Sequence, residues 1–174
     1  MNYSFLHRAL GCLAVAVVAW LMMGCINDDH LDADETTLIG VGQQAPDFTV
    51  EMLDGRSISL RDLRGGVVLL TFWDPECPSC RNLMAATPSA AGVTYLPISR
   101  GYSRAVIADF CQSNGYTFPV GLDPNKSIYM LYATKFVPRS FIIDKRGVVR
   151  SLYVEYELDE LEEILSSAER LAEE

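Results

Sequence analysis

Histidine is nearly absent from this chain of 174 residues, which contains only His7 and His30. Both precede the part of the sequence that has the strand and helix patterns of a folded domain, so neither is a catalytic candidate. Cysteine is also scarce, with five residues, of which only Cys77 and Cys80 form a close pair. No second Cys or His pair has the spacing of zinc ligands, so we predict no metal site.

Basic residues are few as well: 14 Lys and Arg stand against 23 Asp and Glu, which gives a formal net charge of −9. Such an acidic surface repels the phosphates of nucleic acid, so we predict no nucleic-acid partner. The same charge argues against attachment to anionic lipid through basic side chains.

The N-terminal segment has the pattern of an export signal. The mostly apolar stretch from Ala9 to Met23 has the length of a secretory signal and falls short of the roughly 20 residues that a membrane-spanning helix needs. Gly24-Cys25 follows it and resembles the lipobox of bacterial lipoproteins. This resemblance implies a signal peptide over residues 1–24 and lipidation of Cys25, which anchors the chain to a membrane. An uncleaved anchor helix is the alternative, and both predict an exported domain.

The resemblance places the chain on the bacterial outer membrane or on a periplasmic membrane face. Asn27-Asp28-Asp29 resembles the acidic surface-export signal of Bacteroidota lipoproteins, so the cell surface is a further alternative. Residues 25–40 are polar and acidic, and we predict that they form a flexible tether. Residues 41–174 have the length of one domain with its own core.

The rest of the chain alternates between strand and helix patterns. Asp54-Gly55 separates two alternating runs, 48–53 and 57–60, which is the strongest short-range hairpin signal. The continuous apolar run 67–73 predicts a strand buried on both faces. Further predicted strands are 93–98, 117–120, 140–143 and 148–154, and predicted helices are 77–86, 103–113, a segment capped by Asp123 or Asn125 that runs to Tyr132, and 158–171. This order predicts an α/β fold with a mixed central sheet flanked by helices.

The helix over 103–113 has a definite apolar face. Ala105, Val106, Phe110 and Cys111 are the residues that we expect to face the core. Cys111 is then a small buried side chain, and a third redox role is the alternative for it.

Cys77-Pro78-Ser79-Cys80 stands directly behind the apolar run and at the start of a predicted helix. Unpaired backbone N–H groups and the helix dipole favour a thiolate at the first cysteine of such a pair. A disulfide between these cysteines closes a very small loop and stabilises a fold poorly. The pair therefore predicts redox chemistry rather than a structural staple.

Several motifs in order resemble the thioredoxin superfamily, in its exported TlpA/ResA-like branch related to AhpC/TSA proteins. The motifs are Gly42-Gln-Gln-Ala-Pro-Asp-Phe48, Leu53-Asp-Gly55, Ser59-Leu60, Leu63-Arg-Gly65, Phe72-Trp73, Cys77-Pro-Ser-Cys80, Val137-Pro138 and Phe141-Ile-Ile-Asp144 with Gly147. The resemblance implies a thioredoxin-like fold with an N-terminal β-hairpin. It also implies a thiol–disulfide oxidoreductase that needs no cofactor and acts on exported protein thiols and disulfides with an unidentified redox partner.

The resemblance also assigns roles to residues of the site. Cys77 attacks a substrate disulfide and Cys80 resolves the mixed disulfide. Pro138 is expected to be cis, with the backbone of Val137 exposed for pairing with an extended substrate. Trp73 supports the active-site loop or serves only the core.

Three positions depart from the family pattern. Glu76 replaces the usual Trp, and we expect its charge to raise the pKa of Cys77 and to favour a reductant. Thr71 replaces a buried Asp or Asn and cannot act as a base, so the second step depends on water or another carboxylate, or is slow. Arg139 replaces a small residue after the proline and either attracts acidic substrates or is solvated.

Two other functions are alternatives to the oxidoreductase. Peroxiredoxins share the Ala-Pro-Asp-Phe opening, but Asp74 and Leu70 stand where they have Thr and Pro, which disfavours a peroxidase. The departures at Glu76 and Thr71, with the short helix after Cys77, also fit a non-catalytic binding lipoprotein that grips partners through the Pro138 edge.

Overall fold

The computed structural model describes residues 32–174. The predicted signal peptide, the lipidation site at Cys25 and the first part of the predicted tether lie outside the described residues. Within residues 32–174, no helix is both long and apolar enough to cross a membrane.

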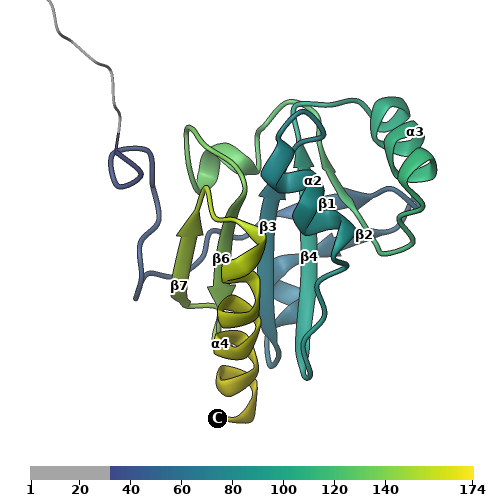
Figure 1. Cartoon of the computed structure of the whole chain (residues 1–174). Helices are drawn as coiled ribbons and strands as arrows, with labels where there is room; N and C mark the ends of the chain where they lie inside the picture. Colours follow the sequence, from purple (N-terminus) through teal and green to yellow (C-terminus); the bar gives the residue numbers. More distant parts are fainter. Residues whose placement is uncertain (1–31) are drawn as a thin grey trace, which may run out of the picture. The chain divides into compact units, whose positions relative to one another are not determined.

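A mixed sheet of seven strands forms the centre of the domain (Figure 1). Its spatial order is β2-β1-β5-β4-β3-β6-β7. The central strands β3, β4 and β5 run parallel to one another, and all other neighbouring pairs are antiparallel. The strands are β1 (Thr49–Met52), β2 (Ser57–Ser59), β3 (Val67–Trp73), β4 (Val93–Arg100), β5 (Gly121–Asp123), β6 (Arg139–Ile143) and β7 (Val149–Val154).

Strand β3 is buried along its whole length because it carries apolar side chains on both faces. Val68, Leu70 and Phe72 point to one face, where they pack with aromatic residues that include Tyr129 and Tyr132. Residues 67 and 69 point to the other face.

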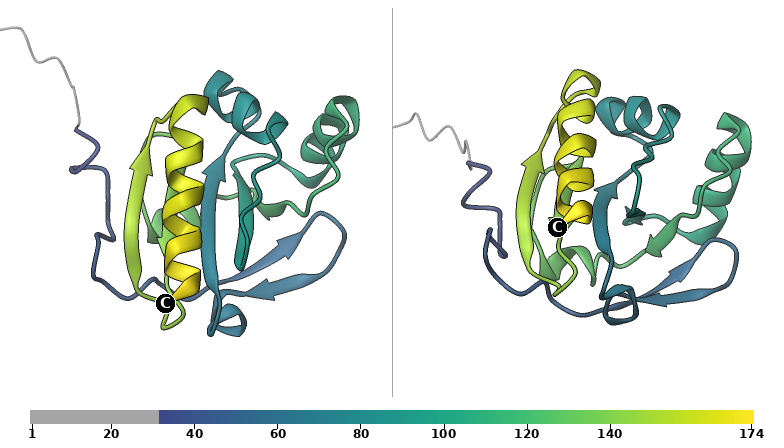
Figure 2. Two further views of the ribbon diagram at one scale, coloured as in Figure 1. Left: turned by 60° about the horizontal axis from the view of Figure 1, so that its bottom comes forward. Right: turned by 90° about the horizontal axis from the view of Figure 1, so that it is seen from below.

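Helices α2 (Pro78–Ala85) and α4 (Leu161–Glu173) cover that second face. The third α-helix is α3 (Arg104–Asn114), and the 3₁₀ helices are η1 (Leu60–Leu63), η2 (Tyr129–Leu131) and η3 (Leu158–Glu160). Leu83 of α2 and Leu161, Ile164 and Ala168 of α4 pack in the same cluster as residues 67 and 69 of β3. Both helices thus lie side by side on one face of the sheet (Figure 2).

Most predicted elements are confirmed, including both hairpins, the buried strand and the mixed α/β sheet. The helix predicted from residue 103 begins with the Ser103 side chain accepting the N–H of Val106 and ends at Gly115, whose φ of 69° suits glycine. Its core face is rotated from the prediction, however. Ile107 and Cys111 are buried, whereas Val106 is 46% exposed.

Two predictions around residue 120 are wrong. The strand expected over 117–120 begins instead at Gly121. The helix expected to run to Tyr132 is reduced to the single turn η2, because Lys126 has a φ of 61° and interrupts it. A carboxylate oxygen of Asp123 accepts the N–H of Tyr129 at 2.8 Å and fixes that turn.

The last residues of the predicted tether are packed on the domain. The N–H of Leu38 donates to the carbonyl of Tyr132, and the N–H of Thr134 donates to the carbonyl of Thr36, each at 2.9 Å. Thr36 is only 1% exposed. The tether prediction therefore fails for residues 36–39, which add to the edge of the domain.

Candidate active site

Cys77 forms the N-cap of α2. Helix α2 follows β3 after a short loop (Figure 1). Its sulfur accepts the N–H of Cys80 at 3.1 Å, so it takes the place of a capping oxygen at the helix start. Pro78 occupies the first helical position, where a missing N–H costs nothing. Cys77 thus lies at the start of a helix, as the local sequence predicted.

The loop before Cys77 is held by Asp74. One carboxylate oxygen accepts the N–H of Cys77 at 3.0 Å and that of Glu76 at 3.2 Å. The other lies 3.4 Å from a guanidinium nitrogen of Arg100, in a pair that is largely buried on both sides. Sequence reasoning missed this role, although an Asp three residues before a helix-capping cysteine is a recognisable capping signal.

The two cysteines have opposite environments. Cys77 is half-buried, and hydrogen bonding from Cys80 lowers its pKa, opposed by burial and by the carboxylates of Asp74 and Glu157. Cys80 is fully buried, and its hydrogen bond with Cys77, together with burial, raises its pKa far above the ordinary range. Both are free thiols. Of the two thiols, the partly exposed Cys77 is therefore the one whose environment favours ionisation, and the buried Cys80 the one whose environment opposes it.

The peptide bond between Val137 and Pro138 is cis, as predicted, and lies beside Cys77. The Cys77 thiol is 3.5 Å from the carbonyl oxygen of Val137, 60 residues away in the chain. Val137 is half-buried and Pro138 is buried. The sheet thus brings together the dithiol and the segment that was expected to meet substrate.

Thr71 lies beneath the site in a buried group of hydroxyls. Its Oγ1 is 2.7 Å from Ser140 Oγ, which is itself 2.6 Å from the hydroxyl of Tyr156. All three residues are at most 4% exposed. The sequence showed the missing carboxyl at Thr71 but gave no sign of the two hydroxyls that meet it there.

Comparison with known proteins identifies the family of this chain. Residues 41–152 match the AhpC/TSA family. The chain is 32% identical over 124 residues to the thiol-disulfide oxidoreductase ResA of Geobacillus thermodenitrificans, covering 68% of this chain and 71% of ResA. The chain belongs to the AhpC/TSA family. It is a thioredoxin-like thiol–disulfide oxidoreductase.

Solved structures of similar proteins show the same fold. A candidate protein disulfide isomerase from Bacteroides thetaiotaomicron superposes with a TM-score of 0.72 at 29% identity, over 80% of this chain and 94% of that one. A candidate thiol:disulfide interchange protein DsbE from Chlorobium tepidum gives 0.66 at 28% identity, over 77% and 98%. These similarities confirm the thioredoxin-like fold that the motifs implied.

Trp73 of this AhpC/TSA-family oxidoreductase is fully buried. It packs in one cluster with Cys80, Met84 and Ile107, and its ring lies 5.8 Å from that of Phe110. It is therefore a core residue, and the core that it belongs to is the one that carries the second cysteine.

The charge of Glu76 does not decide the net pKa shift of Cys77 in the oxidoreductase. The Glu76 side chain is exposed, and the pKa of Cys77 is lowered, chiefly by its hydrogen bond with Cys80. The carboxylates that oppose this lowering are those of Asp74 and Glu157. The pKa of Tyr102 is raised to about 12, by burial and by the nearby carboxylate of Glu76.

Both predictions for Arg139 are wrong, because it is neither solvated nor available to substrates. The side chain is fully buried, and its guanidinium donates to Thr37 Oγ1 at 2.7 Å and to Thr36 Oγ1 at 2.9 Å. Burial lowers its pKa. Arg139 thus fastens the N-terminal segment to the strand that follows Pro138.

The remaining cysteine of the oxidoreductase, Cys111, is 5% exposed on α3, and burial raises its pKa. It packs in the same cluster as Cys80 and Trp73. Its environment is that of a small core residue, as the simpler prediction held.

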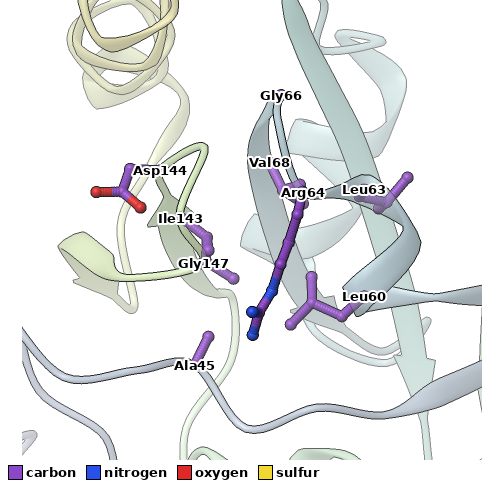
Figure 3. A pocket seen from close by; sticks show the side chains of 9 residues that line it. All are labelled: Ala45, Leu60, Leu63, Arg64, Gly66, Val68, Ile143, Asp144 and Gly147. Carbon is purple, nitrogen blue, oxygen red and sulfur yellow. The ribbon is translucent and has the colours of Figure 1, made fainter.

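A pocket opens at the far end of β3 from the dithiol of the oxidoreductase. Figure 3 shows Arg64 extending across it, among side chains that include Leu60 and Val68. Its water-accessible volume is about 10 Å³, which is about enough for one water molecule. Among residues 32–174, no group of three or more His, Cys, Asp or Glu side chains could hold a metal ion.

Proposed function

We propose that this oxidoreductase is an exported lipoprotein, anchored at Cys25, that exchanges disulfides with exported proteins through Cys77 and Cys80. The apolar stretch before Gly24-Cys25 supports export and anchoring. The thioredoxin-like thiol–disulfide oxidoreductases that the chain resembles support the chemistry.

The observation that carries the proposal is the contrast between the two thiols. Cys77 is partly exposed at a helix start and has a lowered pKa, whereas Cys80 is fully buried and has a raised pKa. A nucleophile that ionises first, above a partner that ionises only when needed, is the arrangement that thiol–disulfide exchange requires.

The proposed reaction has two steps. The Cys77 thiolate attacks a substrate disulfide, forms a mixed disulfide and releases one substrate sulfur, which takes up a proton. Cys80 then loses its proton and attacks Cys77, which closes the Cys77–Cys80 disulfide and releases the second substrate sulfur. Two electrons pass to the substrate, and oxidation of a dithiol follows the same path in reverse. Val137, with its carbonyl beside Cys77, is the proposed contact for an extended substrate.

Insulin reduction by the purified full chain tests this function. We expect the wild-type chain to reduce insulin disulfides with dithiothreitol as electron donor, and Cys77→Ser to be inactive. Cys111→Ser serves as the matched control and should keep full activity. A wild-type chain no faster than Cys77→Ser would overturn the proposal and favour the binding lipoprotein.

Trapping in cells tests the substrates and the location. We expect Cys80→Ala to accumulate mixed disulfides with exported proteins, since the resolving thiol is missing. Cys25→Ser should lose the lipid and leave the membrane fraction. Mixed disulfides with cytoplasmic proteins alone, or membrane attachment that survives Cys25→Ser, would contradict the respective part of the proposal.

A further inference from the structure

Ser79, which lies between the two cysteines, is held by a residue from the other end of the sequence. Its hydroxyl donates to a carboxylate oxygen of Glu157 at 2.6 Å, across 78 residues of chain. A hydroxyl that donates to a carboxylate over so short a distance forms one of the stronger hydrogen bonds in proteins. The Cys77–Cys80 turn is therefore tied to the start of η3.

Glu157 is itself fixed on both sides. The residue before it, Tyr156, is buried and bonded to Ser140. The backbone N–H of Glu157 donates to a carboxylate oxygen of Glu160 at 3.0 Å, at the start of η3. Together with the hydrogen bond from Ser79, these contacts hold the negative charge of Glu157 beside the dithiol, although the side chain is exposed.

Two carboxylates face Cys77, and they differ in what else they do. Asp74 is built into the loop, because it accepts the N–H groups of Glu76 and Cys77 and pairs with Arg100. Glu157 reaches the dithiol only from outside, through Ser79. Both carboxylates raise the pKa of Cys77, against the lowering by Cys80. Glu157 can therefore be changed without dismantling the loop.

We propose that Glu157 is a positioning residue that holds the Cys77–Cys80 turn through Ser79 and limits the stability of the Cys77 thiolate by its negative charge. A less stable thiolate disfavours the reduced form, so Glu157 makes the dithiol a stronger electron donor than it would be without that charge. This inference rests on the proposed thiol–disulfide exchange and assigns its direction partly to a residue outside the motif.

The pH dependence of alkylation tests the inference without any disulfide substrate. Iodoacetamide reacts with the thiolate, so the rate at the Cys77 peptide of the full chain, followed by mass spectrometry, reports the fraction ionised. Glu157→Gln keeps an oxygen that can accept the Ser79 hydroxyl and removes only the charge. We expect its midpoint to fall by about half a pH unit, a change of about threefold in the ionisation equilibrium, and Glu157→Lys to fall further.

Two controls separate the charge from a general structural effect. Glu160→Gln keeps an acceptor for the Glu157 N–H and should leave the midpoint unchanged. The difference between wild type and Glu157→Gln should shrink in 1 M salt, because mobile ions screen exposed charges. At a pH above both alkylation midpoints, the equilibrium with glutathione should shift about threefold toward the reduced form in Glu157→Gln.

Equal midpoints in wild type, Glu157→Gln and Glu157→Lys would overturn the inference, as would an equal shift in Glu160→Gln. The proposed function fails separately: a chain that shows the graded midpoints but reduces no insulin would leave Glu157 as a residue that tunes Cys77 and would refute the exchange activity.

Discussion

Thr71 Oγ1 and Ser140 Oγ lie 2.7 Å apart on the paired strands β3 and β6, at the buried position where the family resemblance led us to expect an Asp or Asn. The Tyr156 hydroxyl completes the group at 2.6 Å from Ser140. Hydroxyls satisfy one another's hydrogen bonds in the interior, but they do not take up a proton near neutral pH. The buried group of Thr71, Ser140 and Tyr156 is therefore a neutral hydrogen-bonded network that contains no base.

Thr71→Val tests what the network contributes to stability. Valine keeps the shape of threonine but removes one buried hydroxyl and leaves Ser140 with a single partner. We expect the free energy of unfolding, measured by urea titration, to fall by about 1–2 kcal/mol. Thr117→Val, at an exposed position, should change it by less than about 0.5 kcal/mol. Equal effects of the two substitutions would argue against a stabilising network.

Thr71→Asp tests the missing base. A carboxylate at this position can accept the Cys80 proton, so we expect release of the second substrate sulfur to accelerate about tenfold or more in single-turnover stopped-flow experiments. Burial of the new carboxyl should lower the free energy of unfolding by about 1–3 kcal/mol. Thr71→Val is the control, because it adds no base, and a release rate no higher in Thr71→Asp would show that deprotonation of Cys80 does not limit the step.

The burial of Tyr156 leads us to expect that the protein loses stability at high pH. Burial raises the pKa of Tyr156 to about 12, while its hydrogen bond with Ser140 acts in the opposite direction. Between pH values of about 10 and 12 the unfolded chain loses a tyrosine proton that the folded chain keeps. The unfolded state then binds fewer protons, so stability falls as pH rises through this window.

The measurement is a series of urea titrations above pH 10. We expect Tyr156→Phe to lose less stability than wild type over this window, by at most about 1.4 kcal/mol per pH unit. Identical slopes for the two proteins would show that Tyr156 ionises equally easily in both states.

The hydrogen bonds of Arg139 to Thr36 and Thr37 attach the N-terminal segment to the domain. In Arg139→Lys a single ammonium replaces the planar guanidinium that reaches Thr36 and Thr37 together. We expect a loss of about 1–3 kcal/mol in the free energy of unfolding and faster proteolysis within residues 32–40. Arg170→Lys is the matched control because its hydrogen bond to Ser167 is exposed. Unchanged proteolysis in Arg139→Lys would mean that backbone pairing alone holds the segment.

Removing the charge of Asp74 is a second way to stabilise the Cys77 thiolate. Asp74→Asn keeps an oxygen for the N–H of Cys77 and removes a charge that raises the pKa of Cys77. We expect the midpoint of Cys77 alkylation to move to lower pH. Asp74→Ala also removes the acceptor and leaves Arg100 without its partner, so it should cost a further 1–3 kcal/mol or so of stability. An unchanged midpoint in a folded Asp74→Asn protein would contradict the electrostatic role.

The helix predicted to run to Tyr132 shows where the local sequence pattern was insufficient. Asp123 was recognised as a capping residue, and it does accept the Tyr129 N–H, but the chain forms one 3₁₀ turn instead of a helix. The rotation of α3 that buries Ile107 rather than Val106 has a similar origin. A weakly patterned helix takes its orientation from the surface that it packs on, and local periodicity does not define that surface.

The sequence by itself determined the elements whose signals are local. The run from Val67 to Trp73 is apolar at every position except Thr71, a pattern that predicts a strand buried on both faces. Cys77 before Pro78 caps a helix because a helix start needs an acceptor for its free N–H groups. The order of the motifs likewise predicts the thioredoxin-like fold.

Only the tertiary structure decided what surrounds the dithiol. Arg139 is buried because residues 36 and 37 pack over it, Thr71 meets Ser140 because β3 pairs with β6, and Glu157 meets Ser79 because η3 packs on α2. These contacts join residues between 69 and 103 positions apart in the chain. Their partners depend on strand register and helix packing, which are settled by the burial of the whole core and are not encoded in the neighbours of any one residue.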